Sequence, residues 1–503
     1  MYTCKSIVID YADQYTIRTP DVTVRGYDMR SVTTLLVVST ALHTSGQVEL
    51  SEDGHLTATP EMYAQSSPAT SARGVFVPFG TEPDWMNTIR RQVGALEIAD
   101  LNGDGHNDLA VGCYISNSFP PYDDWHNLVY FNTGTGLETN ASWISDEQVH
   151  TTDLKIGDIN LDGFPDIFSS NGGSSFSDSY IYFGTASGPA TSAGWIANEP
   201  VATFSLGVAL FDVENDGDLD VITTNQGITP NPFRRTYMFI NNNGTLPTAP
   251  SWESDDQSIQ NTVSVGDYDG DTFDDVLLTK WANFETALHR NNAGTLDTSP
   301  IWTTGSDTTD RGSAAADFDG DTKTDFVVGR SGTSNPSSKY RNTSAGSTPI
   351  LTEDWVSGAP FIGVQDLRAV DVDDDGDIDI GEVHFSDGRA HIYLNQNGTV
   401  PTTPSWTYDA DNVGTAIAFG DLNGDDITDV AIGYSGEPCV RVFYGIAPPC
   451  VADTNGDGML TPADFTAWID AFNNNLSTCD QNGDGSCTPT DFTAWISNFN
   501  TGC

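Results

Sequence analysis

Basic residues are scarce in this chain of 503 residues. It contains 20 Lys and Arg residues against 71 Asp and Glu residues, which gives a formal net charge of −51. Such a chain repels the phosphates of nucleic acids and the head groups of anionic lipids, so binding to nucleic acid or to a membrane surface is excluded. Hydrophobic residues still make up 38% of the chain and aromatic residues 10%, which favours a folded protein over a disordered acidic one. The excess carboxylates need counter-charge, and bound cations are the first candidate.

Long apolar runs are also missing, and the one short run lies near the start of the chain. Residues 32–42 form a mainly apolar run, which follows Met29-Arg30-Ser31 and is itself followed by the small residues 44–46. This pattern is typical of a secretory signal, and the run is too short to span a bilayer. We therefore predict an upstream extension and signal peptide over 1–46, a linker over 47–74, no membrane span, and an extracellular or cell-surface location. The alternative is that 32–42 forms a buried strand.

Cysteines are few and unevenly placed. Of the seven, Cys4 precedes the expected signal, and four of the other six lie between residues 450 and 503. In an exported chain this clustering predicts that disulfides stabilise a small terminal module. Two pairings are hypotheses: Cys450 with Cys503, and Cys479 with Cys487.

An acidic segment of nine residues recurs seven times at intervals of about 50 residues. The copies lie at 100–108, 158–166, 212–220, 267–275, 317–325, 371–379 and 421–429. Short alternating apolar stretches flank each copy, such as 95–99 and 109–112, and a third follows, such as 128–131, leading to a Trp. Four strands in each unit predict a mainly β fold, a seven-bladed β-propeller with four-stranded blades over 75–446.

The ends of the repeat array predict how the ring closes. The last unit stops after a third strand at 439–444 with no Trp behind it, whereas Trp85 precedes the first acidic segment. The strand at Trp85 is therefore expected to complete the seventh blade and remove an exposed edge. Blades one and seven would then be neighbours, which would place Cys113 and Cys439 close together, and a disulfide between them is a further hypothesis. The repeated Trp residues are expected to pack between blades rather than to bind sugar.

The acidic segments have the pattern of calcium loops. Oxygen-bearing side chains stand at positions 1, 3, 5 and 9, and position 7 offers a backbone carbonyl, which suits a hard cation with six to eight oxygen ligands. The expected ligands are Asp100, Asn102, Asp104, His106 and Asp108; Asp158, Asn160, Asp162, Phe164 and Asp166; Asp212, Glu214, Asp216, Asp218 and Asp220; Asp267, Asp269, Asp271, Phe273 and Asp275; Asp317, Asp319, Asp321, Lys323 and Asp325; Asp371, Asp373, Asp375, Asp377 and Asp379; and Asp421, Asn423, Asp425, Ile427 and Asp429. The alternative, that these residues only form turns, is disfavoured by seven copies in register.

Position 6 of these loops permits a sharp bend where it is glycine. Four loops have glycine there, whereas Thr272, Thr322 and Asp426 replace it in the other three. Those three loops are expected to be strained or differently shaped.

Together the loops, their flanking strands and their spacing resemble the FG-GAP/VCBS repeat family, whose propellers also form the heads of integrin α-chains. The resemblance covers 75–446. It implies that each loop joins the first and second strands of a blade and holds calcium for structural reasons. All seven units keep an acidic loop here, whereas integrin heads use only some of them.

A different duplicated pattern fills residues 447–503, after a Pro-rich break. Each copy has a loop with oxygen-bearing residues at positions 1, 3, 5, 7, 9 and 12, followed by an amphipathic helix with aromatic residues at helical spacing. The loop residues are Asp453, Asn455, Asp457, Met459, Thr461 and Asp464, and then Asp480, Asn482, Asp484, Ser486, Thr488 and Asp491. With the seven propeller loops, this gives up to about nine calcium ions.

The terminal module resembles a dockerin, an EF-hand-like calcium module that attaches secreted proteins to cohesin domains. The resemblance implies a cohesin-like or other surface receptor as partner. Positions 10 and 11 of the two loops, where dockerins recognise cohesin, differ between the copies: they are Pro462-Ala463 and Pro489-Thr490. The alternative is a solubilising cap.

The sequence shows no catalytic constellation, since the eight His residues are scattered and no nucleophile elbow, zincin helix or phosphate loop is present. Aromatic and Arg residues occur instead in loops expected on the face opposite the calcium loops. The candidate ligand-binding residues are Phe119, Tyr122, Trp125, Arg234, Arg235 and Trp281. We therefore predict an adhesion or ligand-binding module for a carbohydrate or protein. The alternatives are a polysaccharide-active enzyme, a structural matrix component, and a face that binds nothing.

Overall fold

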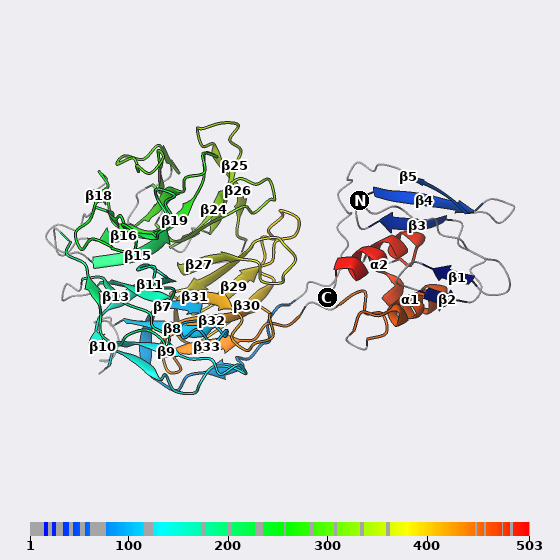
Figure 1. Cartoon of the computed structure of the whole chain (residues 1–503), viewed down its shortest axis with the longest axis horizontal. Helices are drawn as coiled ribbons and strands as arrows, with labels where there is room; N and C mark the ends of the chain where they lie inside the picture. The colour runs from blue at the N-terminus through cyan, green and yellow to red at the C-terminus, as the bar shows by residue number, and fades with distance from the viewer. Residues whose placement is uncertain are drawn as a thin grey trace. The chain divides into compact units, whose positions relative to one another are not determined.

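The computed structural model describes most of the chain from residue 77 onwards. The described residues are 77–114, 124–172, 178–199, 204–226, 235–255, 258–281, 285–305, 309–331, 336–358, 363–447, 450–456, 459–474, 476–482 and 486–501, with the backbone of five strands before residue 61. The chain divides into two units, Val77–Ile446 and the remaining segments Met1–Phe76 and Ala447–Cys503 (Figure 1). Each unit is described by itself.

The segment before residue 77 contains two small antiparallel sheets. One pairs β1 (Tyr15–Arg18) with β2 (Thr23–Gly26), and the other has the order β3 (Thr34–Ser39), β4 (Thr44–Leu50) and β5 (Leu56–Pro60). Strand β3 lies inside the run 32–42, so the backbone there is a strand, as the alternative interpretation expects. Export of the chain stays a prediction. Strands β4 and β5 also occupy part of the segment expected to be a linker.

The unit Val77–Ile446 contains five separate four-stranded antiparallel sheets, each built from consecutive strands. They are β11 (Thr151–Gly157), β12 (Asp166–Asn171), β13 (Tyr180–Tyr182) and β14 (Trp195–Ile196); β15 (Phe204–Phe211), β16 (Asp220–Gln226), β17 (Tyr237–Phe239) and β18 (Trp252–Glu253); β19 (Gln260–Gly266), β20 (Asp275–Lys280), β21 (Ala287–His289) and β22 (Trp302–Thr303); β23 (Asp310–Ala316), β24 (Asp325–Arg330), β25 (Ser338–Asn342) and β26 (Leu351–Val356); and β27 (Val364–Val370), β28 (Asp379–His384), β29 (Ala390–Tyr393) and β30 (Trp406–Tyr408). These five sheets are four-stranded blades, as the repeat predicts.

The other eight strands form one continuous sheet, which corrects the prediction of seven separate blades. These strands are β6 (Trp85–Met86), β7 (Arg91–Ala99), β8 (Asp108–Tyr114), β9 (His126–Tyr130), β10 (Trp143–Gln148), β31 (Val413–Gly420), β32 (Asp429–Gly436) and β33 (Val440–Phe443). The sheet order is β10-β9-β8-β7-β32-β33-β6, with β31 also paired to β32. The physical reason is that β7 and β32 run long, so that Gln92 pairs with Ser435 and Arg91 with Gly436.

The N-terminal strand of this unit closes it, as predicted. Strand β6 pairs antiparallel with β33, with Trp85 opposite Val442 and Met86 opposite Arg441. The predicted disulfide between Cys113 and Cys439 is wrong, because both thiols are free and buried. They interact with other groups instead: the Arg91 guanidinium lies 3.5 Å from the Cys113 sulfur, and the Asn87 amide donates to the Cys439 sulfur at 3.2 Å.

The repeated Trp residues join neighbouring sheets, which confirms their predicted packing role. Trp143, Trp195, Trp355 and Trp406 are buried, and each indole N–H donates to a backbone carbonyl about 50 residues further along the ring or, for Trp406, to Gly80. Trp252 makes the same bond to the carbonyl of Leu296 at 2.9 Å. Each indole therefore contributes both apolar burial and a hydrogen bond to the interface between sheets.

The C-terminal module has the two helices that the sequence predicts. Helix α1 spans Pro462–Asn474 and helix α2 spans Pro489–Thr501, with a 3₁₀ turn at Ser477–Cys479 between them. Trp468 and Trp495 are buried between the helices, and their indoles donate to the carbonyls of Cys479 and Ala452. No helix among the described residues is both long and apolar enough to cross a bilayer.

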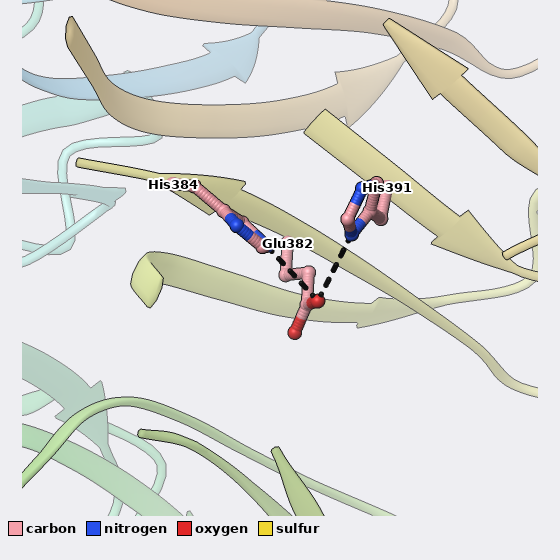
Figure 2. Close-up of side chains that lie close together, drawn as sticks. All are labelled: Glu382, His384 and His391. Carbon is pink, nitrogen blue, oxygen red and sulfur yellow. Dashed lines mark hydrogen bonds and ion pairs between the residues drawn. The ribbon is translucent and has the colours of Figure 1, made fainter. Parts of the chain in front are cut away.

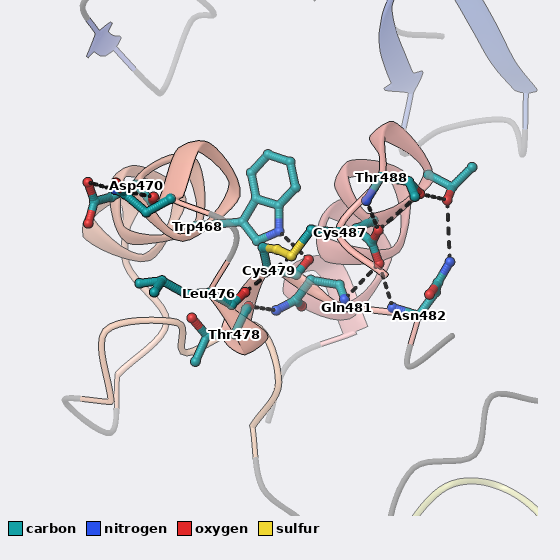
Figure 3. The surroundings of a disulfide bond; sticks show 12 residues. Trp468, Asp470, Leu476, Thr478, Cys479, Gln481, Asn482, Cys487 and Thr488 are labelled. Carbon is teal, nitrogen blue, oxygen red and sulfur yellow. Dashed lines mark hydrogen bonds between the residues drawn. A yellow bond between two sulfur atoms is a disulfide. The ribbon is translucent and has the colours of Figure 1, made fainter. Parts of the chain in front are cut away.

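A disulfide joins Cys479 to Cys487, as predicted, and ties the 3₁₀ turn to the second loop (Figure 3). Cys450 is also disulfide-bonded. Its predicted partner, Cys503, lies outside the described residues.

Candidate functional site

Each acidic loop joins the first and second strands of its sheet, and its first residue orders the backbone. Asp100 follows β7, and its two carboxylate oxygens accept the amide hydrogens of Gly103 at 2.7 Å and Gly105 at 2.8 Å. The position 7 amide then donates to the position 5 carboxylate, as from His106 to Asp104 at 3.0 Å. This pattern wraps the backbone around the side-chain oxygens and recurs in the other loops.

The position 9 aspartate begins the second strand and links three parts of the blade. In the first loop, Asp108 accepts the amide hydrogen of Leu101 at 3.0 Å and that of Asn132, after the third strand, at 2.8 Å. All seven of these aspartates are 0% exposed: Asp108, Asp166, Asp220, Asp275, Asp325, Asp379 and Asp429. Burial, opposed by these backbone hydrogen bonds, raises the pKa of Asp108 to about 6 and that of Asp379 to about 8. The calcium-free loop therefore holds a carboxylate that is costly to ionise.

Position 6 takes the left-handed conformation in all seven loops. Gly105 and Gly376 have φ of 89° and 90°, and Thr272, Thr322 and Asp426 have φ of 76°, 69° and 63°. The loops with Thr or Asp therefore keep the same turn at a backbone conformation that disfavours them, which confirms the expected strain.

Several loop oxygens are arranged as a cation would need. Three acidic groups bring one oxygen from each member within 4.8 Å of the others: Asp267, Asp269 and Asp271; Asp317, Asp319 and Asp325; and Asp371, Asp373 and Asp379. Buried oxygens of Glu214, Asp218 and Asp373 have no hydrogen-bond partner. Burial, followed by neighbouring carboxylates, raises the pKa of Glu214 and of Asp373 to about 7. Hard oxygen donors with unused lone pairs fit calcium, which these residues would hold.

In two loops an arginine side chain forms ion pairs with the loop aspartates, which was not predicted from the sequence. Arg290 lies 2.5 Å from Asp269 and 3.7 Å from Asp271, and Arg341 contacts Asp319 and lies 3.5 Å from Asp321. Each arginine directly precedes the residue whose amide donates to the position 9 aspartate. The other five units have apolar residues in that register: Phe131, Phe183, Ile240, Leu394 and Tyr444. Aligning the third strands would have revealed this substitution.

The loops of the C-terminal module end on buried aspartates. Asp464 accepts amide hydrogens from Asn455 at 3.2 Å and Thr461 at 2.8 Å, and Asp491 accepts those of Gln481 at 2.9 Å and Thr488 at 2.7 Å. Each aspartate lies in the first turn of its helix, where its negative charge interacts favourably with the positive end of the helix dipole. Of the predicted ligands, Asp457 and Asp484 lie outside the described residues.

The first strands of the large unit surround one central cavity of about 370 Å³. Residues from β7, β11, β15, β19, β23, β27 and β31 line it. Ion pairs fill part of its wall: Lys155 contacts Glu97 and lies 3.7 Å from Asp153, while Arg368 lies 2.7 Å from Asp366. The acids on this part of the wall are therefore already neutralised.

At the end of the cavity opposite the acidic loops, an arginine lies between two aromatic rings. The Arg311 guanidinium carbon is 4.1 Å from the ring centroid of Trp281 and 5.5 Å from that of Phe385, and Arg311 also donates to Gln365. Among the described residues no carboxylate pairs with Arg311, and its buried Nε has no hydrogen-bond partner. Burial lowers the pKa of Arg311 to about 10, which leaves it charged at neutral pH. Both aromatic rings are 37% exposed.

Of the three predicted ligand-binding residues that the structure describes, only Trp281 lines this cavity. Trp125 packs against the His150 ring and the core of the first sheet, and Arg235 is held by the Ser254 carbonyl and by Glu253. Phe119, Tyr122 and Arg234 lie outside the described residues. Arg311 and Phe385 were missed because they come from different repeats, and no short motif connects them to Trp281.

A second group that the sequence analysis missed lies inside the sheet β27–β30. Glu382 and His384 share one face of β28, and His391 stands directly opposite Glu382 on β29 (Figure 2). All three are buried. Burial alone would raise the pKa of Glu382, but hydrogen bonds from His384 and His391 and their charge hold it below its usual range. The signal was available, since Glu-x-His on a strand and a His across the next turn place three side chains on one face.

Comparisons with known proteins support the repeat and the fold. The sequence model of the FG-GAP-like repeat matches residues 100–169, 158–223 and 371–432, each match beginning at position 1 of an acidic loop. No curated relative matches the chain. A solved structure, described as the crystal structure of BBS1N in complex with ARL6DN, soaked with lead, is similar with a TM-score of 0.50 and 13% identity, over 75% of this chain and 98% of that chain. This likeness concerns the fold alone. The chain thus carries FG-GAP-like repeats in a β-propeller arrangement.

Proposed function

We propose that this protein is a calcium-stabilised, exported binding module that captures an anionic carbohydrate at the mouth of its central cavity. The eight-stranded sheet is then two blades joined along β7 and β32, which makes seven in all. In favour of this count, the first strands contact one another in a closed cycle, from β7 through β11, β15, β19, β23, β27 and β31 back to β7. The observation that carries the binding proposal is Arg311, a charged guanidinium without a carboxylate partner among the described residues.

The surroundings of Arg311 favour an acidic sugar. A guanidinium pairs with a carboxylate through two parallel hydrogen bonds, and exposed aromatic rings such as those of Trp281 and Phe385 provide stacking faces. The amides of Gln92, Gln226 and Gln365 line the same cavity and match sugar hydroxyl groups in hydrogen-bonding capacity. In a chain of net charge −51, a basic side chain without an acidic partner is unusual, because acidic residues greatly outnumber basic ones.

The test is binding of a uronic-acid oligosaccharide by calorimetry, in millimolar calcium, with the neutral oligosaccharide as comparison. Arg311→Met keeps the apolar stem but removes the charge, and we expect it to weaken binding about 10- to 100-fold, since charge-assisted pairs contribute about 1.5–3 kcal/mol. Arg235→Met, which removes an arginine with acidic partners, is the matched control and should bind like wild type. Equal binding of both sugars, or no effect of Arg311→Met, would contradict the proposal, and release of shorter sugars would favour an enzyme instead.

Calcium is proposed as the cation of the acidic loops, with the loops of Arg290 and Arg341 binding it more weakly than the others. In those two loops a tethered guanidinium already pairs with the aspartates of positions 3 and 5, and in the loop of Arg341 the position 5 aspartate, Asp321, also lies 3.2 Å from Lys323. A calcium ion has to displace the guanidinium, whereas the other five loops have no basic side chain among the ion pairs of their described residues.

The substitutions Arg290→Leu and Arg341→Leu introduce the residue type that Leu394 supplies in the same register. We expect the double variant to be less stable than wild type in chelator and to bind calcium in these two loops at least about tenfold more tightly, as removal of a competing ion pair of about 1.4 kcal/mol predicts. Calcium titration by calorimetry, with Arg235→Leu as control, measures both effects. An unchanged number of tight sites would show that the arginines do not compete with calcium.

The C-terminal module is proposed as a dockerin-like anchor for a cohesin-like or other surface receptor. Its support is the duplicated loop and helix, with Asp464 and Asp491 in equivalent positions. An extracellular or cell-surface location follows from this role and from the disulfide between Cys479 and Cys487.

A further inference from the structure

Three groups converge on a single oxygen inside the sheet β27–β30. Glu382 Oε1 lies 3.1 Å from His384 Nε2, 3.4 Å from His391 Nδ1 and 3.1 Å from the Tyr393 hydroxyl. The other oxygen, Oε2, accepts from Ser337 alone at 2.6 Å. A carboxylate oxygen offers about two lone pairs, yet three polar groups crowd Oε1, and two of them are ring nitrogens that donate only in one tautomer. A cation shared by the carboxylate and the two imidazoles satisfies both ring nitrogens through their lone pairs.

The two distances from Glu382 Oε1 to the ring nitrogens, 3.1 and 3.4 Å, are close to those in a tetrahedral metal centre. Metal–nitrogen and metal–oxygen bonds of about 2.0–2.2 Å place the corners of such a centre roughly 3.3–3.5 Å apart. The ligand atoms of Glu382, His384 and His391 all lie within 4.8 Å of one another. Figure 2 shows both imidazoles directed toward the carboxylate of Glu382, with a dashed line from each ring to that carboxylate.

The surroundings also have the form of a metal site. His384 would bind through Nε2, and its other ring nitrogen lies 3.8 Å from the Asp387 carboxylate. At this distance the carboxylate makes no hydrogen bond to the ring, but its negative charge favours an imidazole that carries positive charge, as a metal-bound imidazole does. The charged groups around the cluster are Asp387 on the β28–β29 turn and Arg389, which pairs with Asp387 and Asp409. The three ligands are at most 3% exposed, so a bound ion would be structural rather than catalytic.

We propose that Glu382, His384 and His391 bind one zinc-class transition-metal ion, with the Tyr393 hydroxyl near the fourth corner. Imidazole nitrogens favour such an ion over calcium, which prefers an all-oxygen site. The site is separate from the acidic loops and does not depend on the proposed carbohydrate binding. A bound ion would cross-link the hairpin of β28 and β29. Through the hydrogen bond from Ser337 to Glu382, it would also stabilise the start of β25.

The test is cobalt substitution in the full chain. The protein is produced in medium supplemented with Co²⁺, so that the buried site loads during folding, and is purified in millimolar calcium to occupy the acidic loops. We expect one Co²⁺ per chain and the strong visible absorption of tetrahedral cobalt with nitrogen ligands. His391→Gln should lose both. His289→Gln should keep both, because His289 is a buried histidine of another sheet, bonded to the Asp297 carbonyl.

A graded variant keeps the test informative where His391→Gln does not fold. Asp387→Asn leaves the ligands in place and removes a nearby negative charge, so it should weaken cobalt binding by roughly 3- to 10-fold. Folded wild-type protein that contains no cobalt or zinc under these conditions would overturn the proposal and show a metal-free hydrogen-bonded cluster. Cobalt with the spectrum of an all-oxygen site, unchanged in His391→Gln, would overturn it too.

Discussion

Removal of divalent cations is expected to lower the melting temperature of the protein by about 10 °C or more at pH 8. A site filled at 100 times its dissociation constant contributes about 2.7 kcal/mol, and several such sites act together. One kcal/mol corresponds to roughly 2–4 °C in chains of 150–250 residues. Because the position 9 aspartates are fully buried, the calcium-free loops cannot relieve their charge through solvent.

The melting temperature of the calcium-free protein is expected to fall as the pH rises. Without calcium, burial raises the pKa of Asp275 and Asp429 to about 7 and that of Asp379 to about 8, from 3.8. Between the ordinary and the raised value the folded chain binds more protons than the unfolded chain, so stability falls as pH rises. In chelator the melting temperature should therefore increase from pH 8 to pH 5, and the stabilisation by calcium should be largest at pH 8.

Thermal melts in chelator, in calcium and in magnesium measure these effects. Magnesium should restore little of the loss, because it retains its water and accepts fewer protein oxygens. Equal melting temperatures in chelator and calcium at pH 8 would refute the metal assignment, and a chelator curve that rises with pH would refute the role of the buried aspartates.

Replacement of Trp406 by alanine is expected to lower the free energy of unfolding by about 3–5 kcal/mol, as for other large buried side chains. The indole packs edge-to-face on Phe79 at 5.4 Å and on Phe443 at 5.1 Å, and its N–H donates to the Gly80 carbonyl at 2.9 Å. These contacts connect the sheet β27–β30 to β33 of the eight-stranded sheet and to the start of the unit. Their loss leaves a cavity at the point of closure.

Denaturant unfolding followed by fluorescence measures the effect of Trp406→Ala. The matched control is Trp281→Ala, which removes an indole that is 37% exposed and should cost less than about 1 kcal/mol. Trp406→Phe, which keeps a ring but loses the hydrogen bond to Gly80, should fall between the two. Equal losses for Trp406→Ala and Trp281→Ala would show that this closure contributes little to stability.

Features with a local period could be predicted from the sequence. The acidic loops, their flanking strands, the Trp residues between sheets and the helices α1 and α2 all follow from spacings within one repeat. The pairing of the strand at Trp85 with the last strand of the array also followed, because an unmatched strand at each end of a repeat array predicts closure.

Features that depend on strand ends and on contacts between repeats were not predicted. The joining of β7 to β32 depends on one or two extra residues in each strand, which no periodicity specifies. The contact of Arg311 with Trp281 and Phe385 brings together three sheets, and the free thiols of Cys113 and Cys439 show that proximity in the ring does not fix a disulfide. By contrast, the Glu382 cluster and the arginines at 290 and 341 were readable in the sequence once the strands were aligned.

The pairing of β6 with β33 has a consequence for biosynthesis. The partner of Trp85 is Val442, so the ribosome has to release nearly the whole array before this pair can form. Until then the nascent chain exposes two unpaired strand edges, and long-range pairing of this kind is slow and prone to aggregation. Productive folding of this protein should thus begin only after synthesis of the propeller is complete, and truncated chains that end before residue 440 should accumulate as insoluble material.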